Sequence, residues 1–436
     1  MNLTQKIFEK ISSNKEIIGV IGLGYVGLPL AVNFAQAGIR VVGFDKNPDK
    51  VDKINDGINY IKDIEDGVLG GVVESQVLQA TTDFTLLKDC DAILICVPTP
   101  LDIYKKPDMS YIESACLEIG RNMKSGTFIC LESTTYPTTT ENFMLPIIER
   151  ESGLKHGSDF WLAYSPERVD PGNEIYKTKN TPKVMGAMSE EGLKIGELIY
   201  KKAINQVHLV SSPRVAEMVK ILENTYRLVN ISLINELALL AGKMDINIWE
   251  VIEAAKTKPF GFQAFYPGPG IGGHCIPLDP FYLEHIAKKF SFDLSMIHTA
   301  GHINMRMPHY MYIKIASALN KHKKSVSGSS VLFLGVAYKP DIDDERESPA
   351  LEIIDIVANK GGEVIYNDPF VPRIKTHEGR SYHSTMLTSQ ALQSADVIVI
   401  TTNHSTYDAA FITEHANLIV DLRNAITPDK NKVFKL

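Results

Sequence analysis

The stretch from Ile17 to Asn47, IIGVIGLGYVGLPLAVNFAQAGIRVVGFDKN, constrains the fold of this chain more than any other. An apolar, β-branched run meets three glycines, a helical pattern follows, and a second apolar run ends at Asp45. Two buried strands with a helix between them form a βαβ unit, which requires a parallel sheet covered by helices. The apolar runs DAILICVP and GTFICLES predict more strands of this sheet. We therefore expect the chain to begin with a doubly wound α/β domain.

The three glycines, Gly22, Gly24 and Gly27, fit the pattern G-x-G-x-x-G between the first strand and the helix. The first permits a tight turn, the second lets a pyrophosphate approach the backbone, and the third lets helix and strand pack closely. Asp45 would accept hydrogen bonds from both ribose hydroxyls and would repel a 2′-phosphate. These residues predict a site for NAD rather than NADP, and the alternative is a structural turn with an incidental acidic residue.

The character of the sequence changes near Ser211, where some thirty residues run without an internal proline or glycine until Gly242. Ser212 can cap the start of a helix and Pro213 suits its first turn. A helix of that length spans about 45 Å, enough to connect two domains and to offer a surface for a second subunit.

Strand and helix patterns alternate again after residue 320. SSVLFLGVAYKPD predicts a strand that leads into a loop, and SPALEIIDIVANKGG predicts a helix with Ser348 as its cap. We therefore expect an α/β fold with two Rossmann-like doubly wound domains, joined by a long central helix and a helical middle domain. The predicted boundaries are 1–205, 206–320 and 321–436.

Composition excludes several kinds of partner. The net charge is −7 and the sequence contains no long basic block, so we expect neither a nucleic-acid partner nor a membrane partner. The N-terminal segment lacks the apolar core of a signal peptide, and no run approaches the roughly 20 apolar residues that span a bilayer. The five cysteines form no C-x-x-C pair, which is typical of a reduced, cytoplasmic protein.

The loop GPGIGGHCIPLDP, from Gly268 to Pro280, carries Cys275 among four glycines and three prolines. A metal ligand would need partners at suitable spacing, and the adjacent His274 rarely shares an ion with its neighbour, so no metal is expected. A buried structural thiol and an exposed nucleophile remain open. Bare glycines would let a bulky substrate reach the sulfur, and the carboxylate of Asp279 follows four residues later.

The long predicted helix contributes Lys220 and Asn224, which are four residues apart and so share one face. Both lie among apolar residues. If that face is buried, the two side chains need polar partners, because an unpaired polar group is costly to bury. The alternative is an exposed pair on the solvent side.

Six motifs, taken together and in order, resemble the UDP-glucose/GDP-mannose 6-dehydrogenase family. They are GVIGLGYVGLPLA, ESTTYPTTT, SPERVDPG, AEMVKILENTYR, PGPGIGGHCIPLDP and GVAYKPDIDDERESPALE. The resemblance extends from about Ile17 to Arg423, and the cysteine loop and YKPDIDDERESP are its most specific parts. It implies an enzyme that oxidises the C6 alcohol of a nucleotide sugar to a carboxylate with two NAD and one water.

The resemblance assigns Cys275 the role of a nucleophile that adds to the C6 aldehyde, so that a thiohemiacetal and then a thioester form. Lys220 would stabilise the oxyanion and Asn224 would share that site. Asp279 would hold Lys220 and position a water molecule. Glu167 would be the general acid/base of thioester hydrolysis, where the alternative is a turn cap.

Further contacts follow from the same resemblance. Thr134 would orient a water near the nicotinamide, Lys339 would reach the substrate, Arg346 would approach the pyrophosphate of NAD, and Arg423 is a weaker substrate candidate; solvated charges are the alternative for the last three. The implied cofactor contacts are Gly22, Gly24, Tyr25, Val26, Gly27, Asp45, Lys50, Pro98, Thr99, Thr134 and Arg346. The implied substrate contacts are Glu167, Arg168, Val169, Lys220, Asn224, Tyr266, Gly268, Gly270, Gly272, Lys339 and Arg423.

Departures from the UDP-glucose pattern favour a UDP-N-acetylhexosamine as substrate. His274 replaces the serine that typically precedes the nucleophile, and RVDPG follows Glu167 where UDP-glucose members have Phe-Leu-Ala-Glu-Gly. GGHCIP and TKPFGFQAFYPGPG are most similar to UDP-N-acetylglucosamine 6-dehydrogenases, which supply surface polysaccharides such as O-antigen. UDP-N-acetylmannosamine and UDP-glucose remain alternative substrates.

One family residue is missing. Many members have an arginine ahead of the cysteine loop that reaches the neighbouring subunit's site, and here that register falls at Pro259, beside Lys258. A lysine does not reproduce the arginine fork. We expect a homodimer or a larger homo-oligomer. A two-electron dehydrogenase would not need Cys275, and a non-catalytic sensor of NAD or nucleotide sugar would not need Cys275, Lys220 and Asp279 together.

Overall fold

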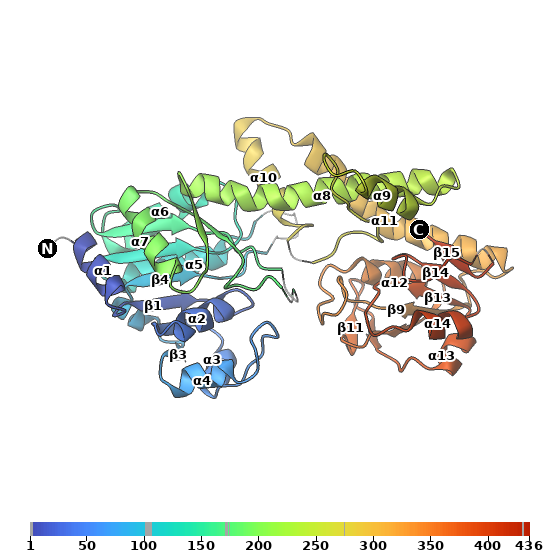
Figure 1. The fold of residues 1–436 in the computed structure, drawn as a ribbon, viewed down its shortest axis with the longest axis horizontal. Coiled ribbons are helices and arrows are strands. Elements are labelled where there is room, and N and C mark those ends of the chain that lie inside the picture. The colour runs from blue at the N-terminus through green and yellow to red at the C-terminus, as the bar shows by residue number, and fades with distance from the viewer. Residues whose placement is uncertain (1–2, 101–106, 171–172, 174, 274, 430) are drawn as a thin grey trace. The chain divides into compact units, whose positions relative to one another are not determined.

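The computed structural model describes residues 3–100, 107–170, 173, 175–273, 275–429 and 431–436. The chain divides into two compact units (Figure 1). The first comprises Met1–Glu223 and Phe281–Ser291, and the second comprises Asn224–Pro280 and Phe292–Leu436. In the described ranges, no helix is both long and apolar enough to cross a membrane.

The first unit is built on an eight-stranded sheet with the order β3-β2-β1-β4-β5-β6-β7-β8. The strands are β1 (Ile17–Ile21), β2 (Arg40–Phe44), β3 (Leu78–Thr81), β4 (Ala92–Ile95), β5 (Thr127–Leu131), β6 (Phe160–Tyr164), β7 (Lys183–Ala187) and β8 (Val207–Val210). All neighbours pair in parallel except β6 and β7. The strand order reverses beside β1, and such a reversal is where α/β sheets bind ligands.

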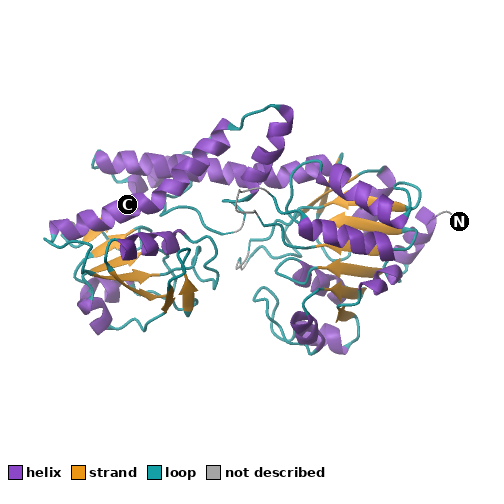
Figure 2. Ribbon diagram, turned by 180° about the vertical axis from the view of Figure 1, so that it is seen from behind, coloured by secondary structure: helices purple, strands orange, loops and turns teal. Residues whose placement is uncertain are grey.

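Helices cover both faces of this sheet (Figure 2). They are α1 (Leu3–Ser12), α2 (Gly27–Gln36), α3 (Pro48–Asn55), α4 (Val68–Glu74), η1 (Phe84–Asp89), α5 (Ser110–Asn122), η2 (Thr140–Met144), α6 (Leu145–Ser152) and α7 (Glu190–Tyr200). Adjacent strand residues such as Val20 and Ile21 belong to different apolar clusters, so both faces of the sheet are buried.

The helical middle of the chain contains α8 (Pro213–Lys243), α9 (Ile248–Lys256), α10 (Asp279–Ala287), η3 (Lys288–Phe290) and α11 (Ser295–Lys321). α8 is 31 residues long and begins at Pro213, as the sequence predicts. Ser212 Oγ accepts a hydrogen bond from Val215 N at 3.4 Å, in the manner of a helix cap.

The second sheet has the order β10-β9-β13-β14-β15, with every pair parallel. Its elements are β9 (Ser330–Leu334), α12 (Pro349–Asn359), β10 (Glu363–Asn367), α13 (Ser389–Ser394), β13 (Val397–Ile400), α14 (Ala409–His415), β14 (Ile419–Asp421) and β15 (Val433–Lys435). A hairpin of β11 (Arg373–Lys375) and β12 (Ser381–His383) accompanies it. Ser348 precedes α12, but its side chain makes no capping hydrogen bond to the described helix.

The predicted fold class is therefore confirmed: the chain has two Rossmann-like, largely parallel sheets, and a helical stretch lies between them in the sequence. The three-domain boundaries at 205/206 and 320/321 remain a prediction. Some predicted site residues, such as Gly22, Thr134 and Lys339, follow the carboxyl ends of strands, whereas Lys220 and Asn224 lie on α8.

Candidate active site

The glycine turn after β1 has the geometry that its sequence predicts. Gly22 has a φ of +92°, and a Cβ there would lie 2.6 Å from the carbonyl oxygen of Cys96. A Cβ on Gly27 would lie 1.9 Å from the carbonyl oxygen of Gly22. A Cβ on Gly24, in contrast, would meet nothing within 4 Å. The turn thus needs glycine at Gly22 and Gly27 for packing. The open space at Gly24 fits a pyrophosphate against the start of α2.

Asp45 connects this turn to the end of β2. Its Oδ2 accepts hydrogen bonds from Leu23 N at 3.0 Å and Lys50 Nζ at 3.2 Å, and its Oδ1 accepts one from Asn47 N at 3.0 Å. The carboxylate is therefore held in place by groups of the turn and of α3. Tyr60, which the sequence did not indicate, donates from its hydroxyl to Leu23 O at 2.6 Å, and burial together with the Asp45 carboxylate raises the pKa of Tyr60.

The loops after β4 and β5 lie at the same edge of the sheet. Ser133 Oγ donates to Val97 O at 2.7 Å, so the segment with Pro98 and Thr99 is tied to the segment with Thr134. Thr134 is half-buried, and Tyr25 and Val26 lie on the neighbouring glycine turn as exposed and half-buried residues respectively.

The loop after β6 brings Glu167 and Lys220 together. Lys220 Nζ donates to the carbonyl oxygen of Glu167 at 2.7 Å. The carboxylate of Glu167 accepts from the amides of Arg168 and Val169 at 2.8 and 2.7 Å, so it also caps its own turn.

Arg168 makes a two-point contact with α8: its Nη2 lies 2.7 Å from Glu223 Oε1, and its Nε lies 3.3 Å from Glu223 Oε2. Its Nη1 also donates to Pro182 O at 2.7 Å. The structure therefore uses this guanidinium to attach the loop to the helix, and its predicted contact with the sugar stays a prediction.

The inward face of α8 is buried. Lys220 and Asn224 are 7% and 8% exposed, so the alternative of a solvent-facing pair is wrong. Asn224 Nδ2 donates to Asp279 Oδ2 at 2.6 Å, and Asp279 is 4% exposed. Asn224 thus contacts Asp279, and Lys220 contacts Glu167; the role of Asp279 in holding Lys220 remains a prediction.

Cys275 lies four positions before Asp279 in the sequence. Its carbonyl oxygen accepts from Asp279 N at 2.8 Å and from Leu278 N at 3.2 Å, so a turn joins the cysteine to the first residue of α10. Cys275 is exposed, whereas Cys90, Cys96, Cys116 and Cys130 are buried. A buried structural role is therefore excluded for Cys275.

The glycines before Cys275 pack on loops of the second sheet. A Cβ on Gly268 would lie 2.6 Å from Nη1 of Arg423, and one on Gly272 would lie 2.7 Å from the carbonyl oxygen of Glu347. Gly270 has a φ of +138°. We expected these glycines to leave room for a substrate. At Gly268 and Gly272 the missing side chain lets the loop pack against other parts of the chain, and the room for a substrate remains a prediction.

The remaining predicted residues all lie in the second unit. Arg346 forms an ion pair with Asp344 through Nη2, at 2.5 Å from Oδ2. Lys339 is half-buried in the loop after β9. Arg423 Nε donates to Thr401 O at 2.8 Å. Burial lowers the pKa of Arg423 to about 10. The same burial disfavours the alternative in which this guanidinium is a solvated charge. Tyr266 stacks on Trp249 of α9 with ring centroids 5.9 Å apart.

Two residues that the sequence did not indicate support the site. Asn235 of α8 accepts from Gly268 N at 2.9 Å and donates to Asn304 of α11 at 2.8 Å. Glu217, one turn before Lys220, is buried and accepts from Thr138 N, Thr140 N and Thr140 Oγ1. Only the spacing of polar residues along α8 could have suggested either.

Among the described residues, no group of three or more His, Cys, Asp or Glu side chains could hold a metal ion. His274, considered above as a ligand, lies outside the described residues.

Comparison with known proteins gives the family. Three domains of the UDP-glucose/GDP-mannose dehydrogenase family match the chain: the NAD binding domain over residues 16–204, the central domain over 214–306 and the UDP binding domain over 332–428. A UDP-N-acetyl-D-mannosamine dehydrogenase of Pyrococcus horikoshii is 37% identical over 415 residues, which cover 94% of this chain and 96% of that protein.

A UDP-N-acetyl-D-glucosamine 6-dehydrogenase of Pseudomonas aeruginosa is 34% identical over 392 residues, 89% of this chain and 91% of that protein. The solved structure of the UDP-D-ManNAc dehydrogenase from Pyrococcus horikoshii superposes with a TM-score of 0.87 at 36% identity, over 96% of this chain and 98% of that one. With these matches over nearly its whole length, the chain belongs to the UDP-glucose/GDP-mannose dehydrogenase family, and its first domain is an NAD-binding domain.

Proposed function

We propose that this chain oxidises C6 of a UDP-N-acetylhexosamine from the alcohol to the carboxylate. The observation that carries the proposal is the exposed Cys275, joined by one turn to the buried Asn224–Asp279 pair. This arrangement occurs in a chain whose matched domains bind NAD and UDP. A thiol has no use in a simple alcohol oxidation, but it is needed at an aldehyde carbon that must be oxidised again.

The cofactor site is proposed at the carboxyl end of β1. Gly22, Gly24 and Gly27 give the pyrophosphate access to backbone amides, and Asp45 accepts from the ribose hydroxyls. Lys50, Tyr25, Val26, Pro98, Thr99 and Thr134 complete the lining, and Arg346 is proposed to reach the pyrophosphate. When bound, NAD supplies the oxidising power of the reaction, two electrons for each molecule, so one sugar consumes two molecules of NAD.

Cys275 is the proposed nucleophile. Its thiolate adds to the C6 aldehyde, and a C–S bond forms as the carbonyl π bond becomes an oxyanion that takes a proton. Loss of the C6 hydrogen with its two electrons, which bound NAD would accept, and loss of the hydroxyl proton turn this thiohemiacetal into a thioester. Water then adds to the thioester carbon, the C–S bond breaks, and the carboxylate leaves with the thiol restored.

Lys220 supplies the positive charge that stabilises the C6 oxyanion, and Asn224 donates a second hydrogen bond there. Asp279 fixes the amide of Asn224 and positions the water. Glu167 takes the proton of that water as general base, and its turn-capping hydrogen bonds hold its carboxylate ready for this step.

The proposed substrate contacts outside the reacting centre come from the loops around Cys275 and the second sheet. Gly270 and Gly272 offer backbone amides, and Gly268, whose own amide binds Asn235, is proposed to line the site beside them. Lys339 and Arg423 offer positive charge to the diphosphate. Arg168, Val169 and Tyr266 are proposed to contact the sugar.

Two sugars are candidates. The segments RVDPG and FGFQAFYPG favour UDP-N-acetylglucosamine, and so does the relative of that name in Pseudomonas aeruginosa. UDP-N-acetylmannosamine is the second candidate, because relatives with that name reach 37% identity. We propose UDP-N-acetylglucosamine as the first to test, and a uronate destined for a polysaccharide as the product.

A homodimer is proposed through α8. On α8, Tyr226, Leu233, Leu237 and Leu240 are 46%, 49%, 40% and 53% exposed, and Met244, the residue after the helix, is 59% exposed. Their spacing of three, four and seven residues places them on one side of the helix. A long apolar stripe on one helix fits the same stripe of a second copy.

The test is NADH formation from UDP-N-acetylglucosamine, UDP-N-acetylmannosamine, UDP-N-acetylgalactosamine and UDP-glucose in parallel, with the mass of each product. Two NADH per sugar and a uronate are expected. One NADH per sugar would contradict the four-electron reaction, and a preference for another sugar would change the substrate while leaving the mechanism in place.

A further inference from the structure

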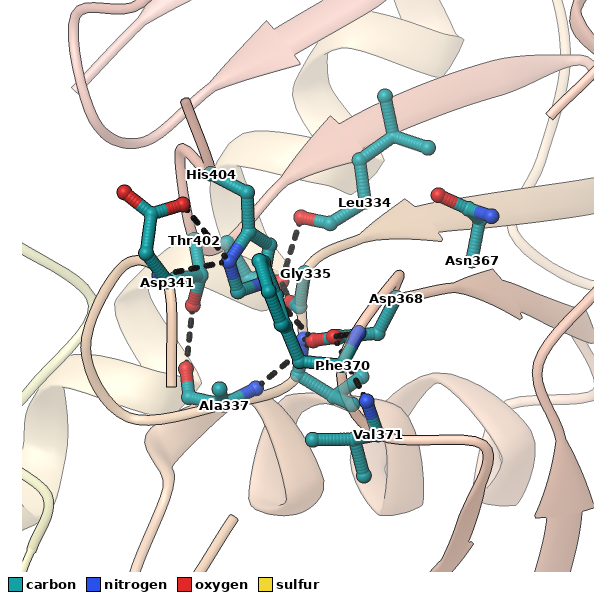
Figure 3. A network of polar contacts seen from close by, with 12 residues as sticks. Leu334, Gly335, Ala337, Asp341, Asn367, Asp368, Phe370, Val371, Thr402 and His404 are labelled. Atoms are coloured by element: carbon teal, nitrogen blue, oxygen red, sulfur yellow. Dashed lines mark hydrogen bonds and ion pairs between the residues drawn. The ribbon is translucent and has the colours of Figure 1, made fainter. Parts of the chain in front are cut away.

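A buried polar cluster lies where β9, β10 and β13 end (Figure 3). At its centre are His404, which is 3% exposed, and Asp368, which is also 3% exposed. His404 Nε2 lies 3.0 Å from Asp368 Oδ2, and the two residues are 36 positions apart in the sequence. The carboxyl ends of these strands flank the point at which the order of the second sheet reverses, where α/β sheets bind ligands.

Asp368 is held as a carboxylate. Besides the contact with His404, its Oδ2 accepts from the amides of Val336 and Ala337 at 2.7 and 3.1 Å, and its Oδ1 accepts from those of Phe370 and Val371 at 2.9 and 3.0 Å. Burial raises the pKa of Asp368, but these hydrogen bonds outweigh burial and hold the pKa below its usual value. The side chain therefore acts only as an acceptor.

Because Asp368 can only accept, His404 must donate from Nε2. The other ring nitrogen, Nδ1, lies 2.9 Å from Asp341 N, and a backbone amide can only donate. His404 is thus a neutral imidazole with its hydrogen on Nε2, and it connects a buried carboxylate to the amide of Asp341. An aromatic or aliphatic side chain could fill the same volume but could not make this connection.

The loop from Val336 to Asp341 carries Lys339 and is fixed at both ends by this cluster. At its start, Asp368 binds two amides, and Thr402 Oγ1 donates to Ala337 O at 2.5 Å. At its end, Asp341 adopts a φ of +63°, which is unfavourable for a residue with a side chain and needs support from its surroundings. His404 supplies that support through the amide of Asp341, and the amide of Ser405 donates to Asp341 Oδ1 at 2.8 Å.

We propose that His404 is a positioning residue for nucleotide binding: through Nδ1 it holds the loop that presents Lys339 to the anionic nucleoside diphosphate of the substrate. The inference deepens the proposed function, because it rests on the contact of Lys339 with the substrate. It names a residue whose effect passes through hydrogen bonds to the loop rather than through contact with the ligand.

Two conservative variants separate the two ring nitrogens. In His404→Asn, the side-chain oxygen replaces Nδ1 as an acceptor, whereas in His404→Gln the amide nitrogen replaces the Nε2 donor. We expect His404→Gln to raise the Kd of UDP, measured by titration calorimetry, about tenfold, and His404→Asn to stay within about threefold of the wild type. KM for NAD should stay unchanged in both. Equal Kd values for the two variants would overturn the proposal.

A double-mutant cycle tests the route through Lys339. Lys339→Met should raise the Kd of UDP, and adding His404→Gln to Lys339→Met should raise it by no more than about twofold, because residues that act through one another are not additive. If His404→Gln raised the Kd of UDP by a further tenfold in the Lys339→Met background, His404 would act elsewhere and the inference would be overturned. The Kd of UDP also keeps this test separate from the proposed oxidation, because it can be measured whether or not any sugar is turned over.

Tyr407→Phe is the matched control. Tyr407 packs on the ring of His404, and its hydroxyl donates to Asn367 O at 2.9 Å, so its removal costs one buried hydrogen bond of the same cluster. Tyr407→Phe removes this hydrogen bond to β10 and leaves the imidazole of His404 and its contact with the amide of Asp341 in place. This variant should lower the thermal midpoint and leave the Kd of UDP unchanged. If Tyr407→Phe raised the Kd of UDP as much as His404→Gln does, a general loosening of the cluster would explain the effect and the proposal would be overturned.

Discussion

Asn224 Nδ2 donates to Asp279 Oδ2 at 2.6 Å between two side chains that are less than a tenth exposed. Asn224 belongs to α8 and Asp279 is the first residue of α10, four positions after Cys275. The helix therefore holds the carboxylate beside the cysteine turn through one amide. Hydrogen bonds to a buried charge are among the stronger ones in proteins.

Replacing Asn224 by alanine should leave the Asp279 carboxylate buried with a lost donor. We expect the free energy of unfolding to fall by about 2 kcal/mol and kcat to fall roughly a hundredfold. Asn230→Ala is the control, since Asn230 lies on the same helix and donates to Tyr226 O near the surface. Equal losses in both variants would contradict a specific role for the Asn224–Asp279 pair.

Cys275→Ser should stop the reaction before the carboxylate. A serine alkoxide forms poorly at neutral pH, so the aldehyde is not captured for a second oxidation, and we expect at most one NADH per sugar and no uronate by mass spectrometry. Undiminished uronate formation would remove Cys275 from the mechanism.

Alkylation offers an independent check on the same cysteine. Cys275 is exposed, while burial raises the pKa of Cys90 to about 12, and the other three thiols are also buried. Iodoacetamide should therefore modify Cys275 first, and bound UDP-sugar should slow the modification. Peptide mapping that finds the label on a buried cysteine first would contradict the exposure of this loop.

Stability should depend on pH through Glu217. Burial raises the pKa of Glu217 to about 7 in the folded chain, against hydrogen bonds from Thr140 and Thr138 that lower it. In the unfolded chain a glutamate titrates near about 4.3, so the folded state binds the extra proton between the two values. The stabilising contribution of Glu217 to the free energy of unfolding is thus fully present below pH ~4.3 and is lost as the pH rises toward ~7.

Glu217→Gln should remove this dependence, so that the thermal midpoint changes less between pH 5 and pH 8 than in the wild type. Glu141→Gln is the control, because Glu141 lies close by and pairs with Arg214 near the surface. The same flattening in both variants would argue against Glu217 as its source.

Asp45→Ala should weaken the choice of NAD over NADP. Loss of the ribose acceptor should raise KM for NAD about tenfold, and loss of the negative charge should lower KM for NADP. Asp45 also binds the amide of Leu23, so part of the effect will appear as a looser glycine turn. Asp49→Ala, an exposed change on α3, should leave both constants unchanged; an unaltered cofactor preference in Asp45→Ala would place the ribose elsewhere.

Leu237→Glu should dissociate the proposed dimer, because it introduces a charge into the apolar stripe of α8. We expect light scattering after gel filtration to give the mass of one chain, 48.4 kDa, instead of twice that value. Met386→Glu adds the same charge at a residue that is 84% exposed in the segment between β12 and α13, and it should not change the mass. A wild-type mass of one chain would contradict the dimer.

Local sequence determined the parts of this protein that depend on neighbouring residues. Gly22 and Gly27 are read directly from their spacing because the turn that they permit lies within one βαβ unit, and the structure leaves no room for a Cβ at either position. The start of α8 at Pro213 is equally local, since a capping serine and a proline in the first turn act within a few residues.

Tertiary structure alone decided which polar groups meet. Glu217 contacts Thr140 across 77 positions, Arg168 contacts Glu223 across 55, and His404 contacts Asp368 across 36. No local pattern carries such pairings, because they follow from how strands and helices pack. For the same reason, the sequence could not show that Arg423 lies against Gly268 and Glu347 against Gly272, because only the fold brings these distant residues together.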